Sequence, residues 1–187
     1  MQSVRNPVWV HGGFATAKLQ STPARDSHPN RQKAYITPRM IQRFLQSYWR
    51  MTRPMTLGAQ GCVLTADSKV LLVKHSYRPG WHFPGGGIEK QETALIALTR
   101  ELDEEANVLL KAPPELHGIF ANFQAFPGDH IVVFVVRNWH QPAPPTPNRE
   151  IVDHGFFSKD QLPDDIHRPT ARRISEILDG ADIAETW

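Results

Sequence analysis

The first regular pattern in the chain is a set of apolar residues spaced as on one face of a helix. They recur three or four positions apart between residues 38 and 50, so residues 37–53 are predicted to contain an amphipathic helix. Thr37 suits the N-cap, Pro38 suits the first helical position, and Pro54 ends the element. The simpler interpretation is a helix that docks on the domain or on a second subunit; the alternative is a basic helix for a membrane or RNA. The apolar face consists of Ile41, Phe44, Leu45, Tyr48 and Trp49.

From Met55 the apolar residues follow the pattern of β-strands. Segments 57–65 and 69–75 are apolar runs separated by the turn-forming residues 66–68, and this predicts a hairpin. Cys62 lies within the first run and is expected to be a small core residue.

A second pair of strand-like runs occupies residues 116–125 and 130–138, joined by the turn-forming residues 126–129. The later run is apolar almost throughout, so we expect it in the interior of a sheet. Residues 142–148 are predicted to be a loop because their prolines cannot join a ladder. One more strand is predicted at residues 150–157.

Two further segments have the helical period, residues 92–106 and residues 170–179. Thr170 is expected to cap the second helix, and Gly180 is expected to end it. The side chains expected to face inward are Ala94, Leu95, Leu98 and Leu102 in the first helix and Ile174, Ile177 and Leu178 in the second.

Strands and helices mix without an internal repeat, so the predicted class is α/β (α+β), with a mixed central sheet between helices. The 187 residues suffice for one domain with a full core, and 40% hydrophobic with 21% charged residues is typical of a soluble globular protein. A single cysteine favours a reducing compartment, and the sequence has no apolar stretch long enough for a membrane span. We therefore expect a cytoplasmic protein without a membrane partner.

Charge is distributed unevenly along the chain. Residues 1–53 contain nine Lys or Arg and one acid, whereas the remainder contains twelve basic and eighteen acidic side chains. Residues 1–36 lack a sustained apolar period and are expected to form a disordered basic extension. The alternatives are an organellar targeting peptide and an arm for nucleic acid or for an anionic membrane. The folded domain is expected in residues 54–187.

Acidic residues crowd the end of the helix predicted at residues 92–106. Glu101, Glu104 and Glu105 are spaced i, i+3 and i+4, so they share one face. Like charges at this spacing repel each other, and the helix dipole disfavours anions at a C-terminus. A hard divalent cation such as Mg²⁺ or Mn²⁺ would remove this conflict. The alternative is a solvated acidic face without a ligand.

Three glycines, Gly85 to Gly87, precede this helix and allow a tight turn that can approach a ligand closely. Glycines and acids together read Gly86-x5-Glu92-x7-Arg100-Glu101-Leu102-x-Glu104-Glu105-x-Asn107-Val108. This pattern, over residues 86–108, closely resembles the Nudix box G-x5-E-x7-R-E-U-x-E-E-x-G-U, in which U is a bulky aliphatic residue. The Phe83-Pro84 lead-in also resembles that family.

One position departs from the box, because Asn107 stands where the family has glycine. In the family pattern this glycine follows the helix, where a left-handed residue would end it. Asn is the non-glycine residue that best tolerates this conformation, so we expect the loop–helix–loop to be preserved.

The resemblance implies an α/β/α sandwich and a divalent-metal-dependent hydrolase. Such an enzyme cleaves the diphosphate bond of a nucleoside diphosphate derivative by attack of water on phosphorus. By similarity, Arg100 belongs to the catalytic set through an ion pair with Glu92 that orients helix and loop, and Gly86 and Asn107 are structural positions of the box. The implied ligands of Mg²⁺ or Mn²⁺ are Glu101, Glu104, Glu105 and the carbonyl of Gly85.

Residues outside the box are expected to select the substrate. Tyr77, Arg78 and Trp81 precede the glycines, and an Arg suits phosphate whereas an aromatic ring suits a base. Trp81 is equally well explained as a core residue. His75 and His130 are interpreted as ordinary strand-end histidines rather than as ligands.

The general base has several candidates. One of the box carboxylates, Glu104 or Glu105, could take the proton. In some family members a later loop supplies the base, and Glu150 and Asp153 are the candidates there.

The resemblance leaves two alternatives to a hydrolase of small nucleotides. One is an enzyme that acts on the 5′ end of RNA, and the other is a sensor that binds a nucleotide without hydrolysing it. A small-molecule nucleotide is the expected partner, nucleic acid is not, and a homodimer is left open.

Overall fold

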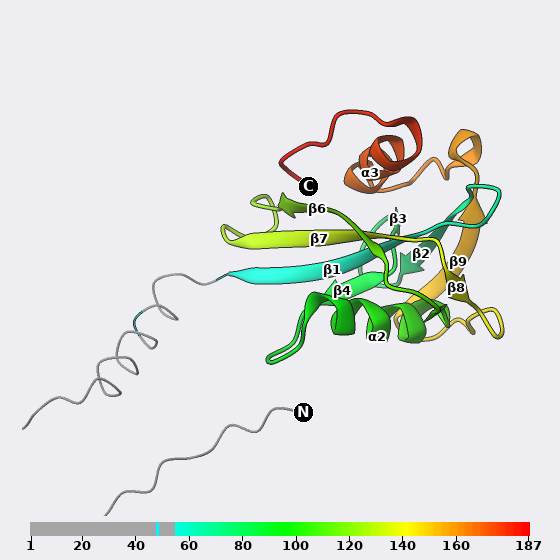
Figure 1. The fold of residues 1–187 in the computed structure, drawn as a ribbon, viewed down its shortest axis with the longest axis horizontal. Helices are drawn as coiled ribbons and strands as arrows, with labels where there is room; N and C mark the ends of the chain where they lie inside the picture. The colour runs from blue at the N-terminus through cyan, green and yellow to red at the C-terminus, as the bar shows by residue number, and fades with distance from the viewer. Residues whose placement is uncertain (1–47, 49–54) are drawn as a thin grey trace, which may run out of the picture.

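In the computed structural model, the described residues are Tyr48 and 55–187. Residues 55–187 form β-strands with a helix on either side (Figure 1). The extension expected at residues 1–36 and the rest of the helix expected at 37–53 lie outside the described residues. No helix in the described part of the chain is long and apolar enough to cross a membrane.

The main sheet has the strand order β4-β1-β7-β6 and is mixed, as predicted. β1 (Thr56–Val63) runs parallel to β7 (Asp129–Val136) and antiparallel to the short strand β4 (Gly85–Gly87). β6 (Glu115–Ala121) pairs antiparallel with β7 and forms an edge of the sheet. The predicted interior position of the apolar run at 130–138 is therefore confirmed.

A second sheet has the order β3-β2-β9 and is antiparallel throughout. It consists of β3 (Trp81–His82), β2 (Val70–His75) and β9 (Ile151–Phe157), the last of which confirms the strand predicted at 150–157. A two-stranded ladder joins β5 (Leu109–Leu110) to β8 (Trp139–His140).

The hairpin predicted from segments 57–65 and 69–75 is wrong. The turn between them exists, since the Thr65 backbone N–H donates to the Lys69 carbonyl at 3.0 Å. However, β1 pairs with β4 and β7, whereas β2 pairs with β3 and β9, so one antiparallel bridge from Leu64 to Val70 is the ladder contact between the two runs. Both runs are buried on two faces, and such strands find partners on both sides from distant parts of the chain.

α2 (Ala94–Ala106) starts two residues later than predicted, with Thr93 as N-cap accepting the Ile96 N–H at 3.2 Å. Leu98 and Leu102 are fully buried as expected, and both contact β1 at Gly61. Leu95 was expected inside but is 42% exposed. The first buried residue of this helix is Ala97.

After the 3₁₀ turn η1 (Lys159–Gln161), α3 (Arg168–Asp179) begins earlier than predicted. Its N-cap is His167, and Thr170 is buried within the first turn instead of capping the helix. Pro169 favours this earlier start because its fixed φ suits the first turn. Gly180 ends the helix in the left-handed conformation at φ +69°, as predicted.

The core has two parts, one on each side of the strands (Figure 1). Alternate residues of β1 face opposite sides, so Ala59 and Val63 pack with α2 while Cys62 packs with Ile174 of α3. Cys62 is thus the core residue that was expected. The layering confirms the predicted α/β (α+β) class and leaves one position of β1, Gln60, facing a cavity on the α3 side.

Candidate functional site

The three glycines lie where the backbone has no space for side chains. Gly85 has φ +144°, and a Cβ there would lie 2.2 Å from the Ala59 carbonyl oxygen of β1. A Cβ at Gly86 would lie 2.4 Å from Oε1 of Glu101. The turn therefore brings a helix carboxylate directly against the backbone of β4, which only glycine permits.

Arg100 fastens the helix to this turn and to the loop before it. Its guanidinium donates two bonds of 3.1 Å to Glu92 and one of 3.2 Å to the Gly87 carbonyl. The same group donates to Glu101 at 2.7 Å and approaches Glu104 at 3.5 Å. These bonds raise the pKa of Arg100 and lower that of Glu92, so both stay charged. The ion pair between Arg100 and Glu92 is therefore present and links helix to loop.

Asn107 ends α2 in the left-handed conformation, with φ +52° and ψ +38°. Its backbone N–H donates to the Asp103 carbonyl at 2.8 Å, and its side-chain amide donates to the Ala143 carbonyl at 2.8 Å. The departure from the box thus keeps the helix end and adds a contact to the 142–148 loop that glycine could not make.

We expect Asn107→Ala to be less stable than the parent protein by about 1–3 kcal/mol. It loses one hydrogen bond and places a residue with a Cβ in the left-handed region without a polar side chain to compensate. Asn107→Gly should cost less than about 1 kcal/mol, since it loses the bond but removes the backbone conflict. Urea unfolding of the three proteins would measure this order, and equal stability of Ala and Gly would contradict it.

Glu105 is the most deeply buried acid of the predicted set, at 5% exposure. Its Oε2 accepts the Gly85 N–H at 2.7 Å. Burial, opposed by the Gly85 hydrogen bond and assisted by the charge of Glu101, raises the pKa of Glu105 to about 8. The carboxyl group that touches the glycine turn is therefore largely uncharged near neutral pH unless a cation lies beside it.

His75 was interpreted from the sequence as an ordinary strand-end histidine. In the structure it lies against Glu105, with its Nδ1 at 3.6 Å from Oε1 of Glu105. Burial lowers the pKa of His75 to about 3, so the contact is not an ion pair at neutral pH. Arg78 Nη2 can only donate and bonds to His75 Nε2, which places the remaining proton on Nδ1, facing Glu105. The imidazole therefore presents an N–H to the carboxylate and no lone pair to a metal.

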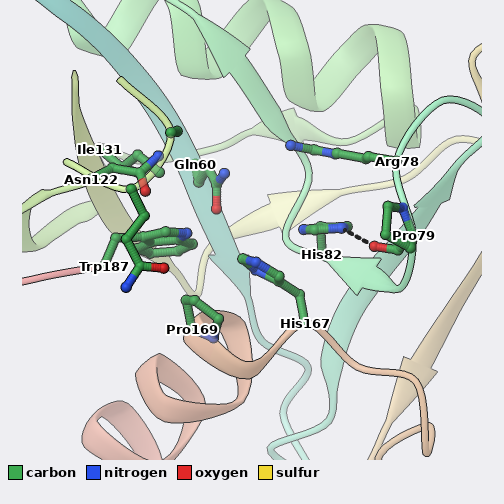
Figure 2. A pocket seen from close by; sticks show the side chains of 11 residues that line it. Gln60, Arg78, Pro79, His82, Asn122, Ile131, His167, Pro169 and Trp187 are labelled. Atoms are coloured by element: carbon green, nitrogen blue, oxygen red, sulfur yellow. Dashed lines mark hydrogen bonds between the residues drawn. The ribbon is translucent and has the colours of Figure 1, made fainter. Parts of the chain in front are cut away.

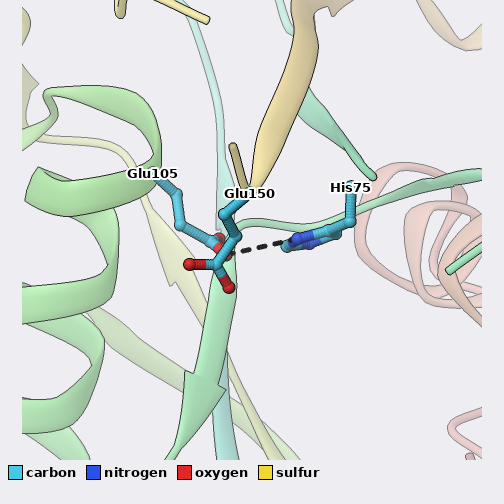
Figure 3. A group of neighbouring side chains, drawn as sticks. All are labelled: His75, Glu105 and Glu150. Carbon is cyan, nitrogen blue, oxygen red and sulfur yellow. Dashed lines mark ion pairs between the residues drawn. The ribbon is translucent and has the colours of Figure 1, made fainter. Parts of the chain in front are cut away.

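Glu150 joins this contact. His75, Glu105 and Glu150 are the one group of three His, Cys, Asp or Glu in the described chain whose candidate ligand atoms all lie within 4.8 Å (Figure 3). The Tyr77 hydroxyl donates to Glu150 at 3.2 Å. Of the two base candidates outside the box, Glu150 is thus beside Glu105, whereas exposed Asp153 lies on β9 and accepts the His154 N–H.

The three predicted metal ligands on α2 are arranged less symmetrically than the spacing suggests. Glu101 and Glu105 contact the glycine turn, whereas the Glu104 side chain is 61% exposed and lies on the Arg100 side. Within the described residues these three carboxylates do not form a group with ligand atoms within 4.8 Å.

The donor set nevertheless fits a hard divalent cation. Such an ion takes oxygen ligands, and Glu101 and Glu105 offer carboxylate oxygens at the same turn. A cation would also return the buried Glu105 to its charged form, which burial alone opposes.

In metal-free protein, the stability contribution of Glu105 should fall as pH rises. Its pKa is about 8 in the folded state against 4.5 ordinarily, so the folded state binds the extra proton between these values. The lowered pKa values of His75 and His82, about 3 and 4, and the lowered pKa of His167 act oppositely, mainly below pH 6.5. Between pH 6.5 and 8 we expect a loss of at most about 2 kcal/mol.

Melting temperatures in EDTA across this range would show the loss. Glu105→Gln should abolish it, and saturating Mg²⁺ should reduce it. A fall that persists in Glu105→Gln would assign it to another group.

A cavity of about 380 Å³ lies beside the glycine turn, between β1, the N-terminus of α3 and the loop at 122–125 (Figure 2). A second hollow, of about 330 Å³, lies over the glycines. Gln60 and Arg78 line both spaces. Within the described part of the chain, each has a buried polar atom without a hydrogen-bond partner, Oε1 and Nε respectively. The residues shared by the two spaces are Gln60, Arg78, Asn122 and Ile131.

The predicted substrate residues are placed differently from one another. Arg78 lines the cavity, and Tyr77 is 65% exposed next to Glu150. Trp81 is 8% exposed and packs edge to face on Phe157 in the core, which is the alternative interpretation of that residue.

Sequence reasoning did not find Gln60, Asn122, His167 or Trp187 of the cavity lining. Only Gln60 carried a usable signal, since it is the one polar side chain in the buried run 59–64. The others come together through folding of distant segments.

Comparison with known proteins identifies the family of this chain. A model of the NUDIX domain family matches residues 55–177. The uncharacterized Nudix hydrolase YvcI of Bacillus subtilis is 41% identical over 71 residues, which cover 38% of this chain and 44% of that protein. A MutT-like protein of Streptomyces ambofaciens is 25% identical over 126 residues, covering 67% of this chain and 79% of that protein.

Among solved structures, an ADP-ribose pyrophosphatase from Streptococcus suis shares the fold. Its TM-score is 0.57 at 24% identity, and the alignment covers 72% of this chain and 97% of that one. The glycine turn, the acidic helix end and the family match over residues 55–177 lead to one conclusion: this chain belongs to the Nudix hydrolase superfamily.

Proposed function

We propose that the protein hydrolyses the diphosphate bond of a nucleoside diphosphate derivative with Mg²⁺ or Mn²⁺. The observation that carries this proposal is the meeting of Glu101 and the buried Glu105 with the backbone of Gly85 and Gly86. Carboxylates held against a glycine turn form a place where a cation and a phosphate can approach together.

Glu101, Glu104 and Glu105 would hold the ion, with the Gly85 carbonyl as a further oxygen ligand. When bound, the ion supplies positive charge that offsets the diphosphate and lowers the pKa of a water molecule. Arg100 keeps the helix and the turn in register, because its bonds reach Glu92, Gly87 and Glu101 at once.

In the proposed reaction, a water oxygen attacks one phosphorus and the bond from that phosphorus to the bridging oxygen breaks. The attacking water must lose a proton. Glu150 is our candidate acceptor, since it lies beside Glu105 and keeps its place through the Tyr77 hydroxyl. Asp153 is the weaker candidate because it lies outside this group. Arg78 suits a phosphate of the substrate, because its buried Nε has no partner in residues 55–187.

A substrate panel tests the proposal. Nucleoside triphosphates, ADP-ribose, UDP-glucose and a 5′-triphosphorylated RNA would each be incubated with Mg²⁺, with Mn²⁺ and with EDTA. Phosphorus NMR in ¹⁸O-labelled water would identify the attacked phosphorus. We expect turnover of at least one small nucleotide only with metal. Tight binding of a nucleotide without turnover would favour the sensor, and turnover of RNA alone would favour the RNA enzyme.

A further inference from the structure

The cavity next to the glycine turn is built from segments far apart in the sequence. β1 contributes Gln60, the loop after β2 contributes Arg78, β3 contributes His82, and the N-cap of α3 is His167. Trp187 forms the opposite wall (Figure 2). At about 380 Å³ the cavity falls in the ~300–1,000 Å³ range of small-molecule sites.

Gln60 is the unusual member of this lining. It is 6% exposed, and its buried Oε1 has no hydrogen-bond partner among the residues that the structure describes. A buried polar group without a hydrogen-bond partner destabilises the folded state. On the same face, Cys62 of β1 and Leu64 directly after the strand are apolar core residues. A strand selected only for stability would carry an apolar side chain here, so this carboxamide indicates a ligand.

The other walls suit a planar ring. His82 and His167 have ring centroids 4.5 Å apart, and the Trp187 ring lies 6.4 Å from His167. Burial lowers the pKa of both histidines, so these rings are uncharged at neutral pH. Uncharged aromatic faces can stack on any of the nucleobases, because every base has a π-face. Discrimination between bases must then come from a polar group such as Gln60.

The cavity and the hollow over the glycines are placed so that one molecule can occupy both. Arg78 lies at the junction of the cavity and the hollow over Gly85 to Gly87, because it lines both. A nucleotide can therefore place its ring by Trp187 and extend its phosphates past Arg78 to the glycine turn.

We infer that this cavity is the base-recognition site of the protein and that Gln60 is its specificity-determining residue. The carboxamide accepts an N–H from the edge of the base, while His167 and Trp187 contact the ring. This inference rests on the proposed function for the identity of the phosphate end, and it names a nucleobase as the group that selects the substrate.

Calorimetric titration with the four 5′-nucleoside monophosphates and with ribose 5-phosphate in Mg²⁺ tests it. We expect one monophosphate to bind at least 10-fold more tightly than ribose 5-phosphate. Gln60→Met, which keeps the length of the side chain, should remove most of that preference and leave ribose 5-phosphate within twofold. Gln161→Met, at an exposed glutamine of η1, is the matched control and should change nothing.

Two results would overturn the inference: equal binding of all four nucleotides and ribose 5-phosphate, or an unchanged preference in Gln60→Met. If Gln60→Met does not fold, Gln60→Asn provides the same comparison with a shortened amide. Failure of the proposed hydrolysis is separable, since base preference that depends on Gln60 in a protein without turnover supports the inference alone. Turnover without base preference refutes the inference alone.

Discussion

Glu105→Gln is expected to lower kcat of the proposed hydrolysis by about 10²-fold or more while leaving the protein at least as stable as the parent. The loss is of the size seen when a preorganised electrostatic group is removed from an active site. Glutamine keeps the shape and can still accept the Gly85 N–H, but it cannot carry the charge that a cation needs. Stability should hold or rise at pH 8, because the buried carboxyl no longer has to ionise.

The matched control is Asp103→Asn on the same helix, an exposed acid that faces away from the turn. Its kcat should stay within twofold, and steady-state kinetics with thermal melts of both variants would compare them. Glu104→Gln tests the ligand that is most exposed, and unchanged turnover there would remove Glu104 from the metal site. Unchanged turnover in Glu105→Gln would contradict the site as a whole.

Glu176→Ala should destabilise the fold by about 3–5 kcal/mol, the largest stability effect we expect from one substitution. Arg173 is fully buried, with its guanidinium 4.0 Å from the Phe120 ring centre. Glu176 accepts from it at 2.6 Å and also from the Ala184 N–H at 3.0 Å. Without the carboxylate, a buried cation is left uncompensated.

Urea unfolding measures this effect, with Glu185→Gln as a control at an exposed acid of the same C-terminal segment. Arg173→Met combined with Glu176→Leu should recover much of the loss, because both charges are then gone. If the single and double variants were equally destabilised, the cost would come from packing instead of from the unpaired charge. Since Arg173 also donates to the Thr186 carbonyl at 3.1 Å, Glu176→Ala should loosen the neighbouring wall of the cavity at Trp187.

The local features of the fold were the predictable ones. The helix at 94–106, its left-handed end at Asn107 and the interior strand β7 follow from spacing and from residues with strong backbone preferences. The pairing of β1 was not predictable from adjacent runs, because its main partner is a strand distant in sequence. Short-range patterns favour a hairpin wherever two apolar runs flank a turn. The residues of the two runs do not indicate which distant strands they pair with.

The candidate site divides in the same way. Glu101, Glu105 and the glycines belong to one continuous segment, so their spacing alone brings them together. His75 and Glu150 reach Glu105 only through the pairing of β2 with β9. Gln60 is recognisable in the sequence as a polar residue in an apolar strand. Trp187 reaches the cavity through the bridge between Thr186 and Ala121, and no periodic pattern in the sequence predicts this bridge.

The parallel pairing of β1 with β7 has a consequence during synthesis. Thr56 bonds Asp129 across a separation of 73 residues, so β1 leaves the ribosome long before its partner exists. At ~5–20 residues per second of translation, this separation keeps an apolar strand waiting for several seconds. During that interval the nascent segment around Ala59 to Leu64 is open to association with other chains. Ribosome-bound intermediates arrested before residue 129 should therefore recruit holdase chaperones more strongly than those arrested after α3.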